Sequence, residues 1–172
     1  MALSTIVKSA IDGTITLNDG TAVTPLSVAL TFDNGDLSIS GLAKTLNEVV
    51  AIQGRGKHRS VRLGARSYPT LSFTAHVSQL TAAADDGPVT DMVLGQGVYS
   101  AAVSTSSGDV YTLDLTYDIE GTDLGDSADQ QIVINDIHCT VDFSESMDGS
   151  TVSISGTIYG AITGDIAAAG LT

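Results

Sequence analysis

The sequence predicts a mainly β protein, namely a β-sandwich or partly closed barrel with one short helix at its edge. Three observations support this fold class. Apolar residues alternate with polar or small residues along most of the chain, as in strands that bury one face. Turn signals that contain glycine separate these segments, and only residues 88–94 have the features of a helix. With 172 residues, the chain has the length of a single domain, 1–172, large enough for a substantial core.

Five strands are predicted in the first half of the chain. They cover residues 14–17, 28–32, 37–40, 49–53 and 71–77. A hairpin turn is expected at Asn18-Asp19-Gly20, because Asp-Gly tolerates positive φ, and a second turn is expected at residues 33–36. Residues 54–59 contain two glycines and three Lys or Arg side chains, so a basic loop is expected there.

The second half begins with the helix and continues with long strands. Proline at the start of the segment 88–94 suits the first helical turn, and Gly95 or Gly97 can end the helix. Strands are expected at residues 98–104, 110–120, 131–144 and 152–163. In the third of these, the apolar positions change parity, and a one-residue slip of this kind predicts a β-bulge near Asn135.

Basic and acidic residues are segregated along the chain. All seven Lys and Arg residues lie within the first 66 positions, whereas 15 of the 20 carboxylates follow them. Because only five carboxylates precede residue 67, the first 66 residues carry a net charge of +2 and the remaining 106 carry −15. Such self-repulsion lowers the stability of a compact state, and it is tolerated where an acidic surface has a use or meets a basic partner.

The basic segment contains Arg55, Lys57, Arg59, Arg62 and Arg66. In so acidic a chain, its expected role is to bind carboxylates of a neighbouring copy, because the guanidinium group is pre-organised and weakly hydrated. Phosphate binding and a plain solvated loop are the alternatives. A net charge of −13 argues against a site that grips nucleic acid, because such a site needs a continuous basic footprint.

No catalytic motif is evident, so an enzyme is not expected and no cofactor is predicted. Residues 40–45 echo a phosphate loop, but they lack the glycine pattern that builds its backbone cradle. His76 and His138 lie on polar faces of strands, where a metal pair across the sheet is an alternative to solvated histidines. The acidic loop 123–129 could chelate Ca²⁺, although its spacing is not that of an EF-hand and a solvated loop is the simpler interpretation.

Cys139 is the only cysteine, so an intramolecular disulfide is excluded. It lies in the apolar row of its strand and is expected to be a buried small hydrophobe rather than a nucleophile. Residues 1–12 have no basic stretch followed by an apolar run, so no signal peptide is expected. No apolar stretch reaches the ~18 residues of a membrane helix. These features predict folding in a cytoplasm, without a membrane anchor.

Several segments resemble the major tail tube proteins of long-tailed bacteriophages. In the first half, the resemblance lies in residues 32–39, 48–52, 55–56, 61–62 and 69–74. In the second half, it lies in the short helix at 88–94, followed by Gly95-Gln96-Gly97 and long strands. In element order it covers nearly the whole chain. The resemblance implies the tail-tube β-sandwich, which is shared with type VI secretion tubes.

The resemblance also implies a structural role in the virion. Six copies would form a ring, and stacked rings would form the hollow viral tail tube that carries DNA from capsid to cell during ejection. The implied partners are copies of the same chain, other phage tail proteins, and DNA in transient passage without sequence specificity. The implied location is the virion tail, after folding in the cytoplasm of the host bacterium.

An acidic lumen would repel the DNA backbone and let the polymer slide. The candidates for lumen-facing residues are Asp114, Asp118 and Glu120, which alternate along one strand opposite its apolar row. Asp142 is placed in the same way on another strand. The alternative for all four is an acidic outer wall that only aids solubility.

Two other classes of function remain open. A capsid decoration or tail-completion protein would also be a β-rich virion component, and a closed ring that does not polymerise would indicate it. A calcium- or glycan-binding module is the second class. Such modules usually expose aromatic platforms, whereas this chain has no Trp and only five Tyr.

Overall fold

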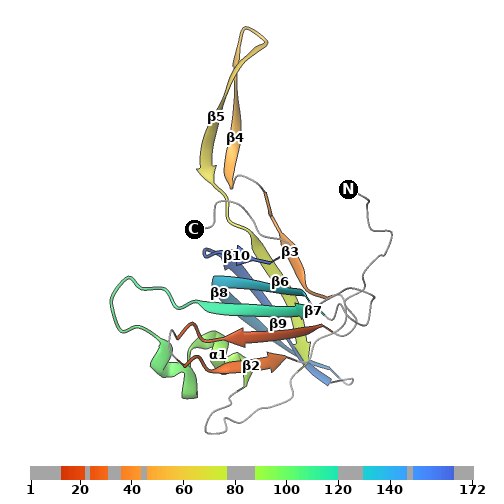
Figure 1. The fold of residues 1–172 in the computed structure, drawn as a ribbon, viewed down its shortest axis with the longest axis vertical. Coiled ribbons are helices and arrows are strands. Elements are labelled where there is room, and N and C mark those ends of the chain that lie inside the picture. Colours follow the sequence, from red (N-terminus) through yellow and green to blue (C-terminus); the bar gives the residue numbers. More distant parts are fainter. Residues whose placement is uncertain are drawn as a thin grey trace.

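A computed structural model describes residues 13–21, 24–30, 36–43, 46–76, 88–119, 130–146 and 149–164. Within these ranges the chain is mainly β, as the sequence predicts (Figure 1). The strands are β1 (Thr14–Asn18), β2 (Ser27–Leu30), β3 (Ser38–Ser40), β4 (Asn47–Gly54), β5 (Lys57–Arg66), β6 (Thr70–His76), β7 (Leu113–Ile119), β8 (Gln130–Ser146), β9 (Gly149–Ile158) and β10 (Ile162–Thr163). The helices are α1 (Val89–Leu94) and the 3₁₀ helix η1 (Gly97–Ala102).

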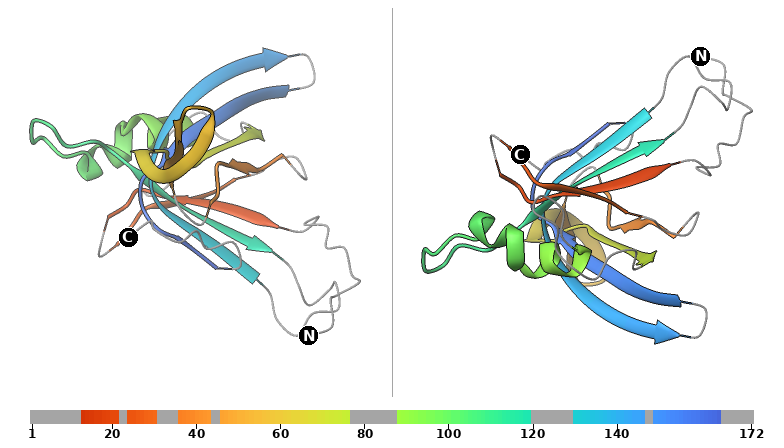
Figure 2. Two further views of the ribbon diagram at one scale, coloured as in Figure 1. Left: turned by 90° about the horizontal axis from the view of Figure 1, so that it is seen from above. Right: turned by 90° about the horizontal axis from the view of Figure 1, so that it is seen from below.

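Most of the strands form one antiparallel sheet that is folded into two layers. The hydrogen-bonded order is β2-β1-β7-β8-β9-β6-β3, and β10 also pairs with β8. The first part of β8 pairs with β7 and β10, whereas its second part pairs with β9. β8 therefore belongs to both layers, and Figure 2 shows the strands on either side of it fanning in different directions. The sheets are not closed into a barrel, and the fold is consistent with the predicted β-sandwich.

The change of layer occurs at a β-bulge in β8. Leu113 of β7 lies opposite Ile137, whereas Leu115 lies opposite Ile134, so three steps along β8 match two along β7. Asp136 in this bulge has a φ of 52°, in the left-handed region that Asp and Asn tolerate better than most residues. The bulge predicted near Asn135 is confirmed, and it explains why the apolar positions change parity there.

The inner faces of the two layers pack against each other in one core. The core side chains from the strands include Ile15, Leu17, Leu113, Leu115, Ile132 and Ile134 in the first layer, and Leu71, Phe73, Ile137, Val152, Ile154 and Ile158 in the second. Helix α1 begins after Pro88 and adds Met92 to this core, and Gly95 ends it in the left-handed conformation, as predicted. Because side chains alternate along each strand, the outer faces of the two layers point away from each other.

Two predicted elements of the first layer are different in the structure. β1 and β2 pair as a hairpin, but residues 19–26 connect them instead of a tight turn at residues 18–20. The Asp19 carboxylate accepts a hydrogen bond from the Thr21 amide at 3.0 Å, and Gly20 has a φ of 73°. The positive φ is as expected, but this local turn starts a longer loop. The strand predicted at residues 110–120 begins only at Leu113.

The strand predicted at residues 98–104 is wrong, because residues 97–102 form the 3₁₀ helix η1. Gly97 has a φ of 59°, which turns the chain away from an extended path, and Tyr99 enters the core with 1% of its surface exposed. The strand predicted at residues 152–163 is interrupted between β9 and β10. At this point a Cβ on Gly160 would lie 2.5 Å from the backbone oxygen of Asn135, so the close approach of the two backbones requires a residue without a side chain.

Candidate functional site

β4 and β5 form a two-stranded sheet of their own, and Figure 1 shows that this hairpin, called the arm below, extends away from the body. Its strands remain paired up to Gly54 and Lys57. Arg55 and Gly56 connect them with φ values of 51° and 76°, and positive φ at both central residues is the feature of a type I′ hairpin turn. The basic loop predicted at residues 54–59 is therefore wrong. The glycine there forms a tight turn, and the basic residues continue the strand.

One face of the arm is apolar and exposed. Val49 lies opposite Leu63, and Ala51 lies opposite Val61, so these four side chains share a face. Val49, Leu63 and Val61 have 63%, 65% and 52% of their surface exposed. An isolated two-stranded hairpin is at best marginally stable in water, and contiguous exposed apolar side chains mark contact surfaces.

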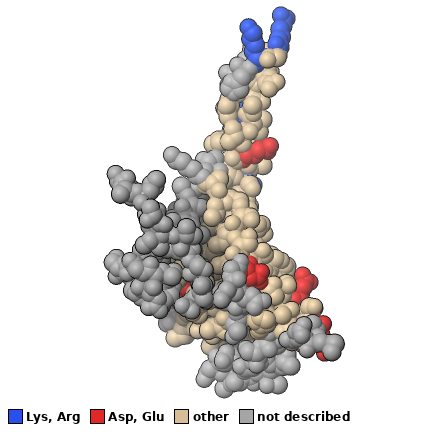
Figure 3. Space-filling view, turned by 90° about the vertical axis from the view of Figure 1, so that its right-hand side faces the viewer, with Lys and Arg blue, Asp and Glu red and all other residues tan. Residues whose placement is uncertain are grey.

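The tip of the arm is basic. Arg55 and Lys57 lie at the turn with exposed side chains. No ion pair joins either of them to another residue in the described ranges. Figure 3 shows Lys and Arg side chains at the far end of the arm, whereas the visible Asp and Glu side chains lie near its base and on the body. The tip therefore presents positive charge far from most of the acidic side chains that are visible in this view.

The other basic residues of the predicted segment lie closer to the body. Arg62 lies opposite Val50, on the face of the arm away from the apolar row. Arg66 lies at the base, with its guanidinium carbon 5.2 Å from the ring centroid of Tyr68. The side chain of Arg59 lies outside what the structure describes. The four described basic side chains are thus spread along the arm and do not form one patch.

The predicted lumen-facing carboxylates lie on two different surfaces. Asp114 and Asp118 are on the outer face of β7, in the first layer. Along this strand they alternate with the buried residues Leu113, Leu115 and Tyr117. Asp142 is exposed on the outer face of the second layer, opposite Ser153. Glu120 lies outside the described residues. Because the two outer faces point away from each other, Asp142 lies on a different surface from Asp114 and Asp118.

Three carboxylates line a small cavity in the first layer, called the acidic cavity below. It has a volume of about 170 Å³ and lies beside the end of β1, the start of β7 and the bulge of β8. Its acidic lining residues are Asp19, Asp114 and Asp136. Asp19 is the most enclosed of these, with 5% of its surface exposed.

Each of the three carboxylates accepts one hydrogen bond within the described part of the chain. The Thr21 amide donates to Asp19 at 3.0 Å, the Asp136 amide donates to Asp114 at 2.9 Å, and the Thr112 hydroxyl lies 3.4 Å from Asp136. In each case the bond is to Oδ1, and no donor among the described residues contacts Oδ2. The cavity therefore combines negative charge with free acceptor capacity, and its described lining contains no basic side chain.

Burial and mutual repulsion act on the ionisable groups of this cavity. Burial raises the pKa of Asp114 above its usual value, and the charges of Asp136 and Asp19 raise it further, against the hydrogen bond from the Asp136 amide. Burial also raises the pKa of Tyr111 to about 12, with a further contribution from the charge of Asp19. A carboxyl whose pKa is raised on folding stabilises the fold below its unfolded pKa of 3.8, and this contribution is lost as the pH rises through the folded pKa. At neutral pH the charge of Asp114 thus opposes folding.

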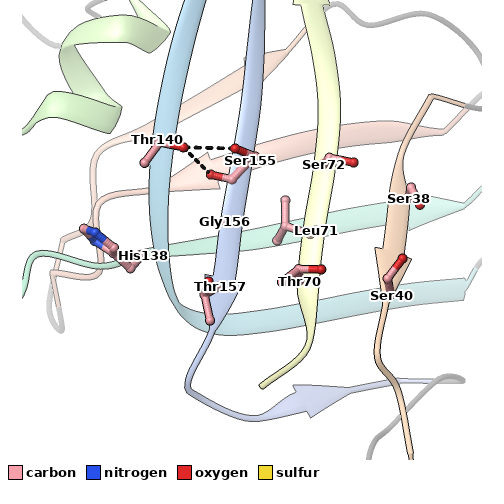
Figure 4. A pocket seen from close by; sticks show the side chains of 10 residues that line it. All are labelled: Ser38, Ser40, Thr70, Leu71, Ser72, His138, Thr140, Ser155, Gly156 and Thr157. Carbon is pink, nitrogen blue, oxygen red and sulfur yellow. Dashed lines mark hydrogen bonds between the residues drawn. The ribbon is translucent and has the colours of Figure 1, made fainter. Parts of the chain in front are cut away.

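The outer face of the second layer carries hydroxyl groups. The aligned residues across β3, β6, β9 and β8 are Ser38, Ser72, Ser155 and Thr140 in one row, and Ser40, Thr70, Thr157 and His138 in the next. Figure 4 shows how they line a shallow groove of about 320 Å³. The Thr140 hydroxyl donates to the Ser155 carbonyl at 3.2 Å. No Lys or Arg occurs among the described residues of these four strands on this face.

The residues considered for metal binding or nucleophilic chemistry are not brought together. His138 lies opposite Thr157 and His76 lies opposite Thr151, so the histidines are separated by about 20 Å along β9. Among the described residues, no three His, Cys, Asp or Glu side chains are placed to hold a metal ion, and the loop 123–129 lies outside these ranges. Cys139 is buried, as predicted, and burial raises the pKa of its thiol to about 12.

No family model, curated protein or solved structure matches this chain. In the described ranges, the helices are too short to cross a membrane. The arm, the acidic cavity and the hydroxyl face are the surfaces of the described residues that bear on function.

Proposed function

We propose that this protein is a structural subunit that binds copies of itself, forming the rings and stacked tube of a phage tail. The observation that carries the proposal is the arm, which forms a sheet separate from the body and exposes an apolar face. Burial of such side chains against a partner stabilises both the hairpin and the complex. The resemblance of the sequence to tail tube proteins supports the tube as the form of the assembly.

A second copy of this chain fits the arm better than an unrelated partner, because the charges are complementary. The arm ends in Arg55 and Lys57, whereas residues 67–172 carry a net charge of −15. Opposite charges on two regions of the same chain attract each other between copies and orient their encounter. The charge segregation that destabilises a single subunit thus has a use in an assembly.

The hydroxyl face of the second layer is the best candidate for the wall of the tube. It presents Ser and Thr side chains and Asp142 and, within the described strands, no cation that would hold a phosphate. Phosphate binding depends mainly on Lys and Arg contacts, so DNA would pass along such a wall without adhering. On this proposal, Asp114 and Asp118 lie away from the lumen, because they are on the opposite outer face.

The test is the state of association of the purified chain. Sedimentation velocity at tens of micromolar should show hexamers or larger species, and negative-stain electron microscopy should show rings or tubes of uniform width. Closed rings that never stack would favour a capsid decoration or tail-completion protein. A chain that stays monomeric under all these conditions, also with tail-initiating proteins added, would contradict self-assembly.

A further inference from the structure

The described lining of the acidic cavity contains three carboxylates and no basic side chain. Asp19 is a carboxylate with only 5% of its surface exposed, and its Oδ2 has no hydrogen-bond donor among the described residues. Burying a charged group without a full set of partners is costly. Asp114 and Asp136 line the same 170 Å³ cavity and add like charge. A positively charged group with several N–H donors would satisfy all three carboxylates at once.

The tip of the arm carries a group of this kind. Arg55 is the first central residue of the turn, and its φ of 51° keeps its backbone in the tight connection between β4 and β5. Its side chain is exposed, without an ion pair in the described part of the chain. Lys57 follows directly after the turn and is also exposed. A guanidinium group is small enough for the cavity and offers five donors in a fixed plane.

The tip and the acidic cavity of one chain are too far apart to meet. The cavity lies next to residues 102–104, directly after η1, and Figure 1 shows the helices near one end of the molecule and the tip of the arm at the other. Any contact between them must therefore join two copies. Because the two surfaces differ, the contact is head-to-tail, and repetition of such contacts generates closed rings or open filaments.

We infer that the tip of the arm of one copy, led by Arg55, inserts into the cavity formed by Asp19, Asp114 and Asp136 of the next copy. The inference rests on the proposed self-assembly and assigns the two surfaces that carry it. The apolar face of the arm then packs along the neighbouring copy, while the charged tip fixes the position of the arm on that copy. Each copy contributes one tip and receives one, so the assembly has a direction.

Two neutralised variants test this contact. The tip variant combines Arg55→Asn with Lys57→Gln, since Asn tolerates the positive φ at position 55. The cavity variant combines Asp114→Asn with Asp136→Asn, which keeps the oxygen acceptors and the positive φ at position 136. Each should need an about tenfold or higher concentration than the parent to assemble, because one partner of a buried charge pair is lost. Asp118→Asn with Glu145→Gln changes the net charge equally outside the cavity and should assemble like the parent.

Mixing the two variants gives the sharpest outcome. The tip variant retains an intact cavity and the cavity variant retains an intact tip, so an equimolar mixture should form one-to-one pairs that cannot extend. Sedimentation velocity with one variant fluorescently labelled measures these pairs. Circular dichroism and thermal melting should show that both variants are folded, the cavity variant at least as stably as the parent.

The possible failures distinguish the two proposals. If the parent assembles and the cavity variant assembles at the same concentration, the assignment of the cavity is wrong while self-assembly stands. The same conclusion follows if the mixture of variants forms no pairs, or if added Ca²⁺ rather than the tip stabilises the cavity. If the parent itself never assembles, both proposals fail.

Discussion

Replacing the apolar row of the arm should weaken assembly and leave the subunit intact. The triple variant Val49→Thr, Val61→Thr and Leu63→Thr retains residues that favour strands. Between 52% and 65% of each side chain is exposed in the single subunit, and this surface is what a partner would cover. Since full burial of Val or Leu is worth about 1.5–3 kcal/mol, covering the exposed part of three side chains contributes about 3 kcal/mol. That amount corresponds to an about 100-fold change in affinity.

The assay is the concentration at which the chain begins to assemble, measured by light scattering and sedimentation. The triple variant should need an about 100-fold higher concentration than the parent. Its free energy of unfolding as a monomer should change by less than about 1 kcal/mol, because surface substitutions rarely change this quantity by more. Leu94→Gln on α1, with 55% of Leu94 exposed, is the control for loss of an exposed apolar side chain elsewhere. Assembly of the triple variant at the parental concentration would refute the reasoning.

Four further outcomes are expected. Asp114→Asn should raise the free energy of unfolding of the isolated subunit at pH 7 and remove part of its stabilisation on acidification, as followed by denaturant titration. Gly160→Ala should destabilise the fold by about 1–3 kcal/mol in the same assay, because its Cβ would lie 2.5 Å from a backbone oxygen. Cys139 should react with a thiol reagent at pH 8 far more slowly in the folded chain than in urea, since its thiol is buried with a raised pKa. Asp142→Lys should leave tubes intact but slow the ejection of DNA, and unchanged ejection would count against the proposed wall.

The sandwich was predictable because period-2 alternation is a direct consequence of burying one face of a strand. The bulge in β8 was predictable for the same reason, since a change in parity near Asn135 requires an extra residue. The 3₁₀ helix at residues 97–102 was not predictable, because its alternation resembles that of a strand. The choice of a 3₁₀ helix over a strand is determined there by the positive φ of Gly97 and the burial of Tyr99, which depend on tertiary packing.

The candidate site was only partly predictable. The basic residues of the arm lie close together in the sequence, so a contact role could be hypothesised from charge alone, but their position on a projecting hairpin could not. The signal was present in Arg55-Gly56, because glycine at the second central position suits a tight turn. The acidic cavity was missed, because Asp19, Asp114 and Asp136 come from distant parts of the chain. Only the pairing of β1 with β7 and of β7 with β8 brings them together.

Because the arm is separate from the core, its length can be changed independently of the rest of the fold. Because β4 and β5 pair only with each other, their length can change without disturbing the sandwich. Removal of two residues from each strand would shorten the arm by about 6.6 Å and keep every side chain on its face, whereas removal of one from each would turn the tip to the other side. In the proposed assembly, the distance between joined copies could therefore vary in steps of two residue pairs, while the sandwich stays the same.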